Sequence, residues 1–194
     1  MSMTDRRPGP SARERQALIA FGALARAFLT PLWIGLHEAD RTWNLIRELP
    51  AVPSTALCRH TCLFALRLLA SLGQRNWQAA SGEVRRSAMP QVPAYVGGAE
   101  AARHYWLRHP LFGWFDLAAD QFGLPEIMLA NPSDAAFAGY VERSETAPLR
   151  NLKRTIRNWE GRPNGSWSAA DLERQAEAYR RLREEAGHLL NPMG

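Results

Sequence analysis

The feature that most constrains the fold is an apolar segment, residues 57–72, that lies between signals for the start and the end of a helix. Ser54 or Thr55 precedes it as a candidate N-terminal cap, and Gly73 follows it as a natural C-terminal stop. Apolar side chains occupy most faces of this predicted helix, and such a helix has to be buried. The rest of the chain is therefore expected to pack around it.

Two helices are predicted before this segment. Ser11 and Glu14 have the spacing of a capping box, and apolar residues recur at helical spacing after them. Pro31 is predicted to end or restart the helix, with a second helix over about 32–49. Residues 1–10 are polar and rich in proline and glycine, which predicts a disordered tail.

The pattern changes from helical to extended after Gly73. A short strand is predicted over 76–82 and a loop over 83–100. Aromatic residues in 103–107 and 114–117 flank a turn with proline and glycine, which predicts a β-hairpin. Residues 124–147 show no clean period.

The C-terminal part is predicted to be helical again. Residues 149–159 carry one apolar stripe, and Ser168 is a candidate cap for a helix from 169 to about 190. The order of helices, strands and helices predicts an α+β fold. We expect one α+β domain over 11–147 and a C-terminal helical extension over 148–194 that packs on it.

The composition is that of a globular protein. The chain has 194 residues, of which 46% are hydrophobic and 22% charged, so wholesale disorder is not expected. Its two cysteines are too few for a disulfide framework, and no apolar signal segment or run long enough for a membrane span is apparent. We expect a cytoplasmic protein, or an effector delivered without a signal peptide, and no contact with membranes.

Cys58 is the candidate nucleophile. It lies in the first turn of the buried helix, where the free N–H groups and Arg59 favour a thiolate. The alternative is an inert buried cysteine, and we interpret Cys62, one turn further on, as a packing residue. His60 points about 200° around the helix from Cys58, at about 100° per residue. It is therefore not expected to act as the base for Cys58 or to complete a metal site, and no metal is expected.

His104 is the candidate base, with Asp116 as its partner. Pairing the predicted hairpin about residue 110 places the two directly opposite each other, with Cβ atoms ~5 Å apart. A carboxylate in that position would orient the imidazole and stabilise its charged form. The alternative is a surface cross-strand pair, and a slip of one residue in the pairing would separate the two side chains.

The order of the Cys helix, His104-Tyr105-Trp106 and Asp116-Leu117-Ala118 resembles the transglutaminase-like and papain-like cysteine enzyme superfamily. The two short motifs are similar to the His-x-Trp and Asp-x-Thr patterns of transglutaminase-like domains. Residues 116–123 are also similar to the Asp-Leu-Thr-Ala-Asp-Gln-Phe tail of small bacterial members of uncertain function. The resemblance covers about 54–123.

This resemblance implies a core in which a buried Cys-bearing helix packs on a small antiparallel sheet, with helices flanking it at both ends of the chain. Cys58 would be the nucleophile, His104 the base and Asp116 the orienting acid. The implied activity is that of a thiol-protease type of hydrolase: a peptidase, amidase or protein deamidase acting on a protein or peptide, without a cofactor. Transglutaminase-type cross-linking is an alternative. Candidates for oxyanion or substrate contacts are Gln121, Tyr105, Trp106 and Trp114.

Two further functions remain as alternatives. The chain has Ala118 where the family pattern has threonine, and no glutamine shortly before Cys58, which favours a non-catalytic interaction module on the same fold. Arginines in 150–157 and 180–183 suggest a nucleic-acid-binding protein, but acidic residues dilute the second cluster. We therefore expect no nucleic-acid partner, and consider the C-terminal helices a surface for a protein partner.

Overall fold

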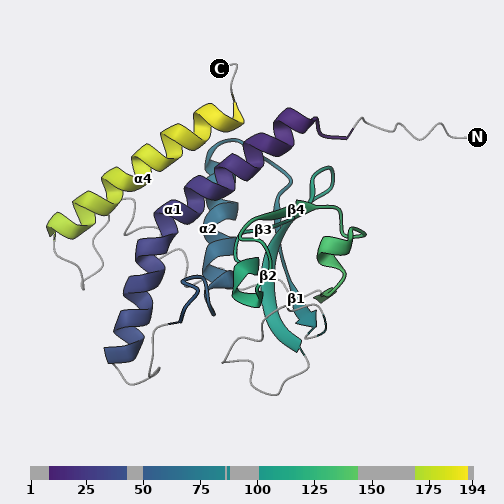
Figure 1. The fold of residues 1–194 in the computed structure, drawn as a ribbon. Coiled ribbons are helices and arrows are strands. Elements are labelled where there is room, and N and C mark those ends of the chain that lie inside the picture. Colours follow the sequence, from purple (N-terminus) through teal and green to yellow (C-terminus); the bar gives the residue numbers. More distant parts are fainter. Residues whose placement is uncertain (1–8, 43–49, 86, 88–100, 144–168, 192–194) are drawn as a thin grey trace, which may run out of the picture.

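The computed structural model describes residues 9–42, 50–85, 87, 101–143 and 169–191 (Figure 1). Within these ranges the fold is α+β, with three α-helices and one antiparallel sheet whose strands run in the order β4-β3-β2-β1-β5. The helices are α1 (Ala12–Thr42), α2 (Cys58–Ser71) and α4 (Ala169–Leu190). The strands are β1 (Gln78–Arg85), β2 (Ala101–His109), β3 (Gly113–Asp116), β4 (Met128–Ala130) and β5 (Tyr140–Arg143).

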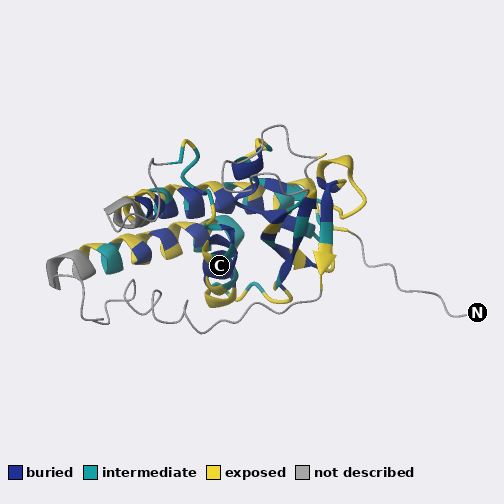
Figure 2. Ribbon diagram, turned by 90° about the horizontal axis from the view of Figure 1, so that it is seen from below, coloured by how far each residue is buried: buried dark blue, intermediate teal, exposed yellow. Residues whose placement is uncertain are grey.

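The helices pack together on one side of the sheet. Helix α4 lies alongside α1, and α2 packs against β1 and β2 (Figure 1). Figure 2 shows the buried positions where these elements face one another. Phe21 and Trp33 of α1, Leu68 of α2 and Leu182 of α4 belong to one buried apolar cluster. Helix α4 is therefore part of the main hydrophobic core.

Helix α1 begins as predicted and continues further than predicted. The Glu14 N–H donates to Ser11 Oγ at 3.2 Å, and the Ser11 N–H donates to the Glu14 carboxylate at 2.7 Å, which confirms the capping box. The predicted break at Pro31 is wrong, because the helix runs through it, although Figure 1 shows its axis turning in that half. Burial of Leu29 and Trp33 on either side offsets the one backbone hydrogen bond that proline removes. Residues 1–8 of the predicted disordered tail and residues 43–49 of the predicted second helix lie outside the described residues.

Helix α2 is buried, as predicted, but its N-terminus differs. Its N-terminal flanking residue is Leu57, with no side-chain cap, so the predicted caps Ser54 and Thr55 are wrong. Ser54 is instead fully buried, and its hydroxyl donates to the Asp120 carboxylate at 2.6 Å. Gly73 follows the helix in the left-handed region with φ of 76°, which confirms the predicted stop.

The β2–β3 hairpin forms with a register different from the predicted one. Leu107 pairs with Phe115 and His109 with Gly113, so the hairpin is centred on residue 111 rather than 110. His104 and Asp116 are therefore offset along their strands by two residues instead of directly opposite. Because side chains alternate with a period of two, this offset leaves them on the same face of the sheet.

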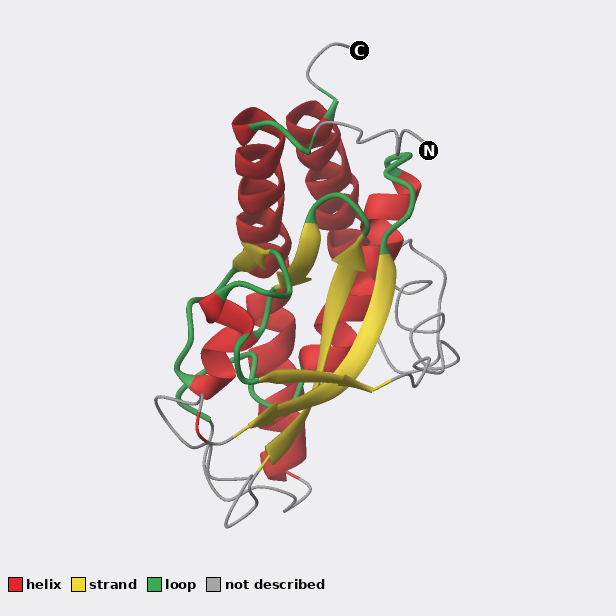
Figure 3. Ribbon diagram, turned by 90° about the vertical axis from the view of Figure 1, so that its right-hand side faces the viewer, coloured by secondary structure: helices red, strands yellow, loops and turns green. Residues whose placement is uncertain are grey.

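The sheet also contains strands that the sequence pattern did not predict. Strands β4 and β5 lie within 124–147 and have only three and four residues. Strand β5 pairs with β1 and β4 with β3, so they form opposite edges of the sheet (Figure 3). Strand β4 is shorter than the roughly 4–8 residues over which alternation is recognised, and β5 is at the lower limit of that range.

The expectation that no segment is long enough to cross a membrane needs correction. Within the described part of the chain, Ala12–Gly35 has the length and apolar composition of a membrane span. Core helices of soluble proteins meet the same criterion. Here the apolar positions Leu18, Phe21, Ala25 and Leu29 are buried within the fold.

Candidate functional site

The structure brings together the three residues that the sequence singled out as a triad. Cys58 is the first residue of α2, His104 lies in β2 and Asp116 ends β3. His104 Nε2 donates to Asp116 Oδ2 at 2.5 Å, and the imidazole is also hydrogen-bonded to the Cys58 side chain. The exposed fractions of Cys58, His104 and Asp116 are 7%, 0% and 1%. The three side chains therefore interact away from bulk water, where electrostatic interactions are strong.

Asp116 is held by three hydrogen bonds. Its Oδ2 accepts from His104 and from the Tyr140 hydroxyl at 2.6 Å, and its Oδ1 accepts from the Ala118 N–H at 2.9 Å. The bond from residue 118 comes from the backbone, so the alanine in place of threonine does not remove it. Burial and the Asp116 charge raise the pKa of Tyr140, which keeps the phenol protonated as a donor. These bonds orient the carboxylate toward the imidazole.

Tyr140 is a site residue that the sequence analysis missed. It lies on β5, which joins the sheet on the far side of β1, and the segment around it had no recognisable period. No local signal connects it with Asp116. Only the strand order brings the phenol to the carboxylate.

His104 has an unusual electrostatic environment. Burial disfavours its charged form, but the charges of Asp116 and Cys58 and the hydrogen bonds to them favour it more strongly and raise its pKa to about 10. The buried carboxylate thus stabilises an imidazolium next to the sulfur atom.

Aromatic rings enclose the imidazole. The ring centroids of Trp106, Phe122 and Tyr140 lie 6.0, 4.8 and 5.7 Å from that of His104, and Trp114 contacts Trp106. Of the candidates for oxyanion or substrate contacts, Trp106 therefore adjoins the triad, and Trp114 contacts Trp106.

Tyr105, another candidate for a substrate contact, is not brought to the triad. It alternates with its neighbours in β2 onto the other face of the sheet and packs against the helical core. Its contact is with Arg103, whose guanidinium lies 5.8 Å from the Tyr105 ring centroid. The structure therefore separates Tyr105 from the triad, and a substrate contact at this residue stays a prediction.

Cys62 has the packing role that its position predicted. Its thiol donates to the Trp106 carbonyl oxygen, with Sγ and O 3.1 Å apart. Burial, with the charges of Asp116 and Cys58, raises the pKa of Cys62, so it remains a thiol. His60 is exposed on another face of the helix. No group of three or more His, Cys, Asp or Glu side chains in the described ranges is arranged to hold a metal ion.

Gln121 also reaches the site. Its Nε2 donates to the Ala118 carbonyl oxygen at 2.7 Å and lies 3.3 Å from His104 Nδ1, while its Oε1 accepts from the Ala56 N–H at 3.3 Å. The side chain is 4% exposed. Its amide protons are directed at these protein atoms, so the geometry places Gln121 beside the imidazole rather than as a free oxyanion donor.

A buried ion pair supports the site from outside the triad. Arg26 of α1 bonds Asp120 Oδ2 through Nη2 at 2.5 Å and the Leu117 carbonyl oxygen through Nη1 at 2.6 Å. Asp120 also accepts the Ser54 hydroxyl. This network connects α1, the segment before Cys58 and the segment after Asp116. The one sequence signal for this network is Arg26, which follows Ala25 of the apolar stripe in a predicted helix.

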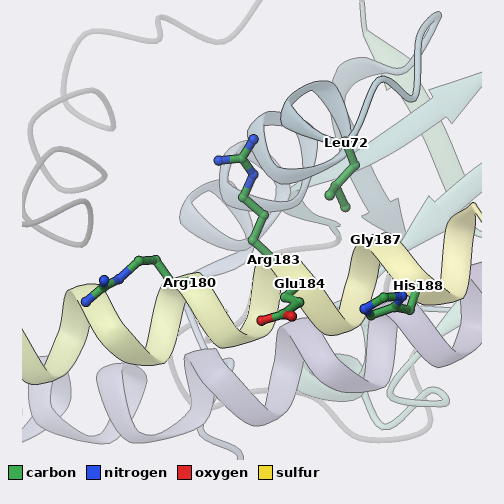
Figure 4. A pocket seen from close by; sticks show the side chains of 6 residues that line it. All are labelled: Leu72, Arg180, Arg183, Glu184, Gly187 and His188. Atoms are coloured by element: carbon green, nitrogen blue, oxygen red, sulfur yellow. The ribbon is translucent and has the colours of Figure 1, made fainter. Parts of the chain in front are cut away.

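A shallow groove lies apart from the triad, at the C-terminal end of α2 (Figure 4). Figure 4 labels the residues that line it: Leu72, Arg180, Arg183, Glu184, Gly187 and His188. Arg180 and Arg181 both pair with Glu177, which partly offsets the basic charge of α4. A partner surface on this helix stays a prediction, and the basic stretch 150–157 lies outside the described residues.

Comparison with known proteins yields no relative. No family model, curated protein or solved structure matches this chain.

Proposed function

We propose that this protein is a thiol-dependent acyl-transfer enzyme that acts on amides, with Cys58 as nucleophile, His104 as acid and base, and Asp116 as orienting residue. The observation that carries the proposal is the fully buried His104, which is bonded to Asp116 through Nε2 and hydrogen-bonded to Cys58. A cysteine at the start of a helix on an antiparallel sheet is also in keeping with a papain-like or transglutaminase-like core.

Acylation begins with proton transfer from the Cys58 thiol to His104 Nδ1. Nε2 is already bonded to the Asp116 carboxylate, which leaves Nδ1 as the nitrogen that gains and loses the proton. The thiolate attacks the amide carbonyl carbon, so that a C–S bond forms and the carbonyl oxygen becomes an oxyanion. When the C–N bond breaks, the Nδ1 proton goes to the leaving amine and a thioester remains on Cys58.

The oxyanion is stabilised by the start of α2. The first N–H groups of a helix have no intrahelical acceptor and carry partial positive charge. The Cys58 N–H belongs to this set, since Cys58 is the first residue of the helix. Loss of one such donor costs about 3–4 kcal/mol of transition-state stabilisation in related sites.

Deacylation reverses the proton transfers. His104 Nδ1 accepts a proton from the attacking nucleophile, the C–S bond breaks, and the proton returns to the Cys58 sulfur. Water as the nucleophile gives hydrolysis or deamidation, and a primary amine gives a new amide, as in transglutaminase-type cross-linking. A protein or peptide supplies the amide in either case.

The test is the rate of Cys58 alkylation by iodoacetamide as a function of pH, with peptide mass spectrometry to separate Cys58 from Cys62. We compare the wild-type protein with His104→Ala and Asp116→Asn, and use Cys62→Ser as the matched control for loss of a buried thiol. Circular dichroism verifies that each variant is folded.

We expect Cys58 of the folded wild-type protein to be alkylated readily, because the imidazolium of His104 lies beside its sulfur atom. His104→Ala is expected to move this reactivity to higher pH, and Cys62→Ser to leave it unchanged. The proposal would be overturned if Cys58 did not react in the folded protein. It would also be overturned if the pH profile of alkylation were the same in His104→Ala and in the wild type. The three side chains would then be a buried hydrogen-bonded cluster in a non-catalytic module.

A further inference from the structure

We infer that Gln121 is a positioning residue of this site, and that it holds the loop leading into Cys58 and the imidazole of His104 in a fixed relation. The inference rests on the proposed function and goes beyond it, because it gives a role to a residue of the segment after Asp116 that the proposed mechanism does not use. The Gln121 side chain contacts both the loop that precedes Cys58 and the imidazole of His104.

The loop before Cys58 has a backbone conformation that needs support. Ala56 has φ of 61°, in the left-handed region that non-glycine residues rarely adopt. Such residues persist where surrounding contacts hold them, and they cluster at functional sites. The Ala56 N–H donates to Gln121 Oε1. Gln121 thus holds the strained residue that precedes the nucleophile by two positions.

The amide nitrogen of the same side chain lies beside the imidazole of His104. Gln121 Nε2 is anchored by the Ala118 carbonyl oxygen and lies 3.3 Å from His104 Nδ1. An amide N–H donates to Nδ1 only when Nδ1 carries no proton. Gln121 therefore stabilises the neutral imidazole, which is the base that deacylation requires.

The other neighbours of the imidazole favour its charged form or act on the loop. Asp116 faces Nε2 and accepts from Tyr140, and Cys58 faces the ring from α2; these favour the charged form. Asp120 holds Ser54 in the same loop but does not contact the imidazole. Gln121 is thus the neighbour that opposes protonation of Nδ1.

The test uses Gln121→Met, which has a similar length and no amide, and Gln121→Glu, which retains an acceptor for the Ala56 N–H but has a carboxylate near Nδ1. The pH midpoint of His104 protonation is measured by NMR of labelled imidazole, in the wild-type and in a Cys58→Ala background. Gln74→Met is the matched control, because Gln74 is a half-buried glutamine whose amide bonds Asn191.

We expect the midpoint to rise in Gln121→Met by about half to one pH unit, the equivalent of one hydrogen bond, and to rise further in Gln121→Glu. The plateau rate of Cys58 alkylation is expected to fall as the Ala56 turn loosens. Gln74→Met is expected to change neither quantity. If Gln121→Met does not fold, Gln121→Glu carries the test, since it keeps the size and shape of the native side chain.

A midpoint that is unchanged or lower in the Gln121 variants would overturn the inference, including the case in which only thermal stability falls. The NMR measurement in Cys58→Ala does not depend on thiol chemistry. A raised midpoint with an unreactive Cys58 would therefore refute the proposed enzyme and leave the role of Gln121 intact. A reactive, His104-dependent Cys58 with an unchanged midpoint would refute only the inference.

Discussion

Removing the charge of Arg26 is expected to destabilise the fold strongly. The side chains of Arg26 and Asp120 are only 9% and 13% exposed, and their atoms lie 2.5 Å apart. In Arg26→Met the aliphatic stem remains, but Asp120 becomes a buried charge without its cation, and the Leu117 carbonyl oxygen loses a donor. Breaking a buried pair from one side costs about 3–5 kcal/mol. For a chain of this size, that lowers Tm by roughly 6–20 °C.

The assay is urea unfolding followed by circular dichroism, in a double-mutant cycle of Arg26→Met, Asp120→Asn and the combination. Since each single change leaves the other member unsatisfied, we expect the double variant to lose less stability than the sum of the two single losses. Arg108 and Glu142 form a matched exposed pair, with side chains 47% and 29% exposed. Their cycle is expected to give a coupling of about 0–1 kcal/mol.

Two outcomes would refute this reasoning. One is a loss below about 1 kcal/mol in Arg26→Met, the value of an exposed pair rather than a buried one. The other is strict additivity of the two single changes, which would mean that the two side chains stabilise the fold independently. Either would remove the ion pair as the link between α1 and the segments around Cys58 and Asp116.

Three further perturbations test separate parts of the structure. A Cβ on Gly82 would lie 2.0 Å from the Val141 carbonyl oxygen, whereas one on Gly35 would meet no atom within 4 Å; Gly82→Ala should therefore lower Tm sharply, and Gly35→Ala should raise stability by about 1 kcal/mol. Ala56→Gly removes the left-handed strain, so urea unfolding should show a gain of about 0.5–1 kcal/mol, and a loss would contradict that account of the turn. The pKa of His104, about 10 in the folded protein, lies above its ordinary value of about 6.5, so the folded state binds an extra proton between these pH values. The stability that His104 contributes is complete below about pH 6.5 and is lost as pH rises toward 10; unfolding of the wild type and His104→Gln at several pH values checks this, and a stability difference that is constant across the window would contradict it.

Local sequence patterns were sufficient for features that depend on neighbouring residues. The capping box at Ser11, the stop at Gly73 and the burial of the Cys helix follow from spacing and composition. The pairing of His104 with Asp116 was predicted in the wrong register. It still occurs because a shift of two residues preserves the face of the strand, whereas a shift of one would have separated the side chains.

The features that sequence reasoning missed depend on residues distant in the chain. Pro31 was predicted to divide α1, but burial of the residues on either side keeps the helix continuous. The cap expected from Ser54 fails because its hydroxyl has a charged acceptor in Asp120. In both cases a tertiary contact outweighs a local preference.

The sequence by itself determined which side chains are chemically equipped for the site: a thiol at the start of a buried helix, and an imidazole and a carboxylate on one face of a hairpin. Only the tertiary structure decided what surrounds them. Tyr140 reaches Asp116 from the far edge strand, and Gln121 connects Ala56 with His104 across the turn after β3. These contacts follow from strand order and chain path, which local periodicity does not encode, because hydrogen bonds between distant segments form only once the core has brought them together.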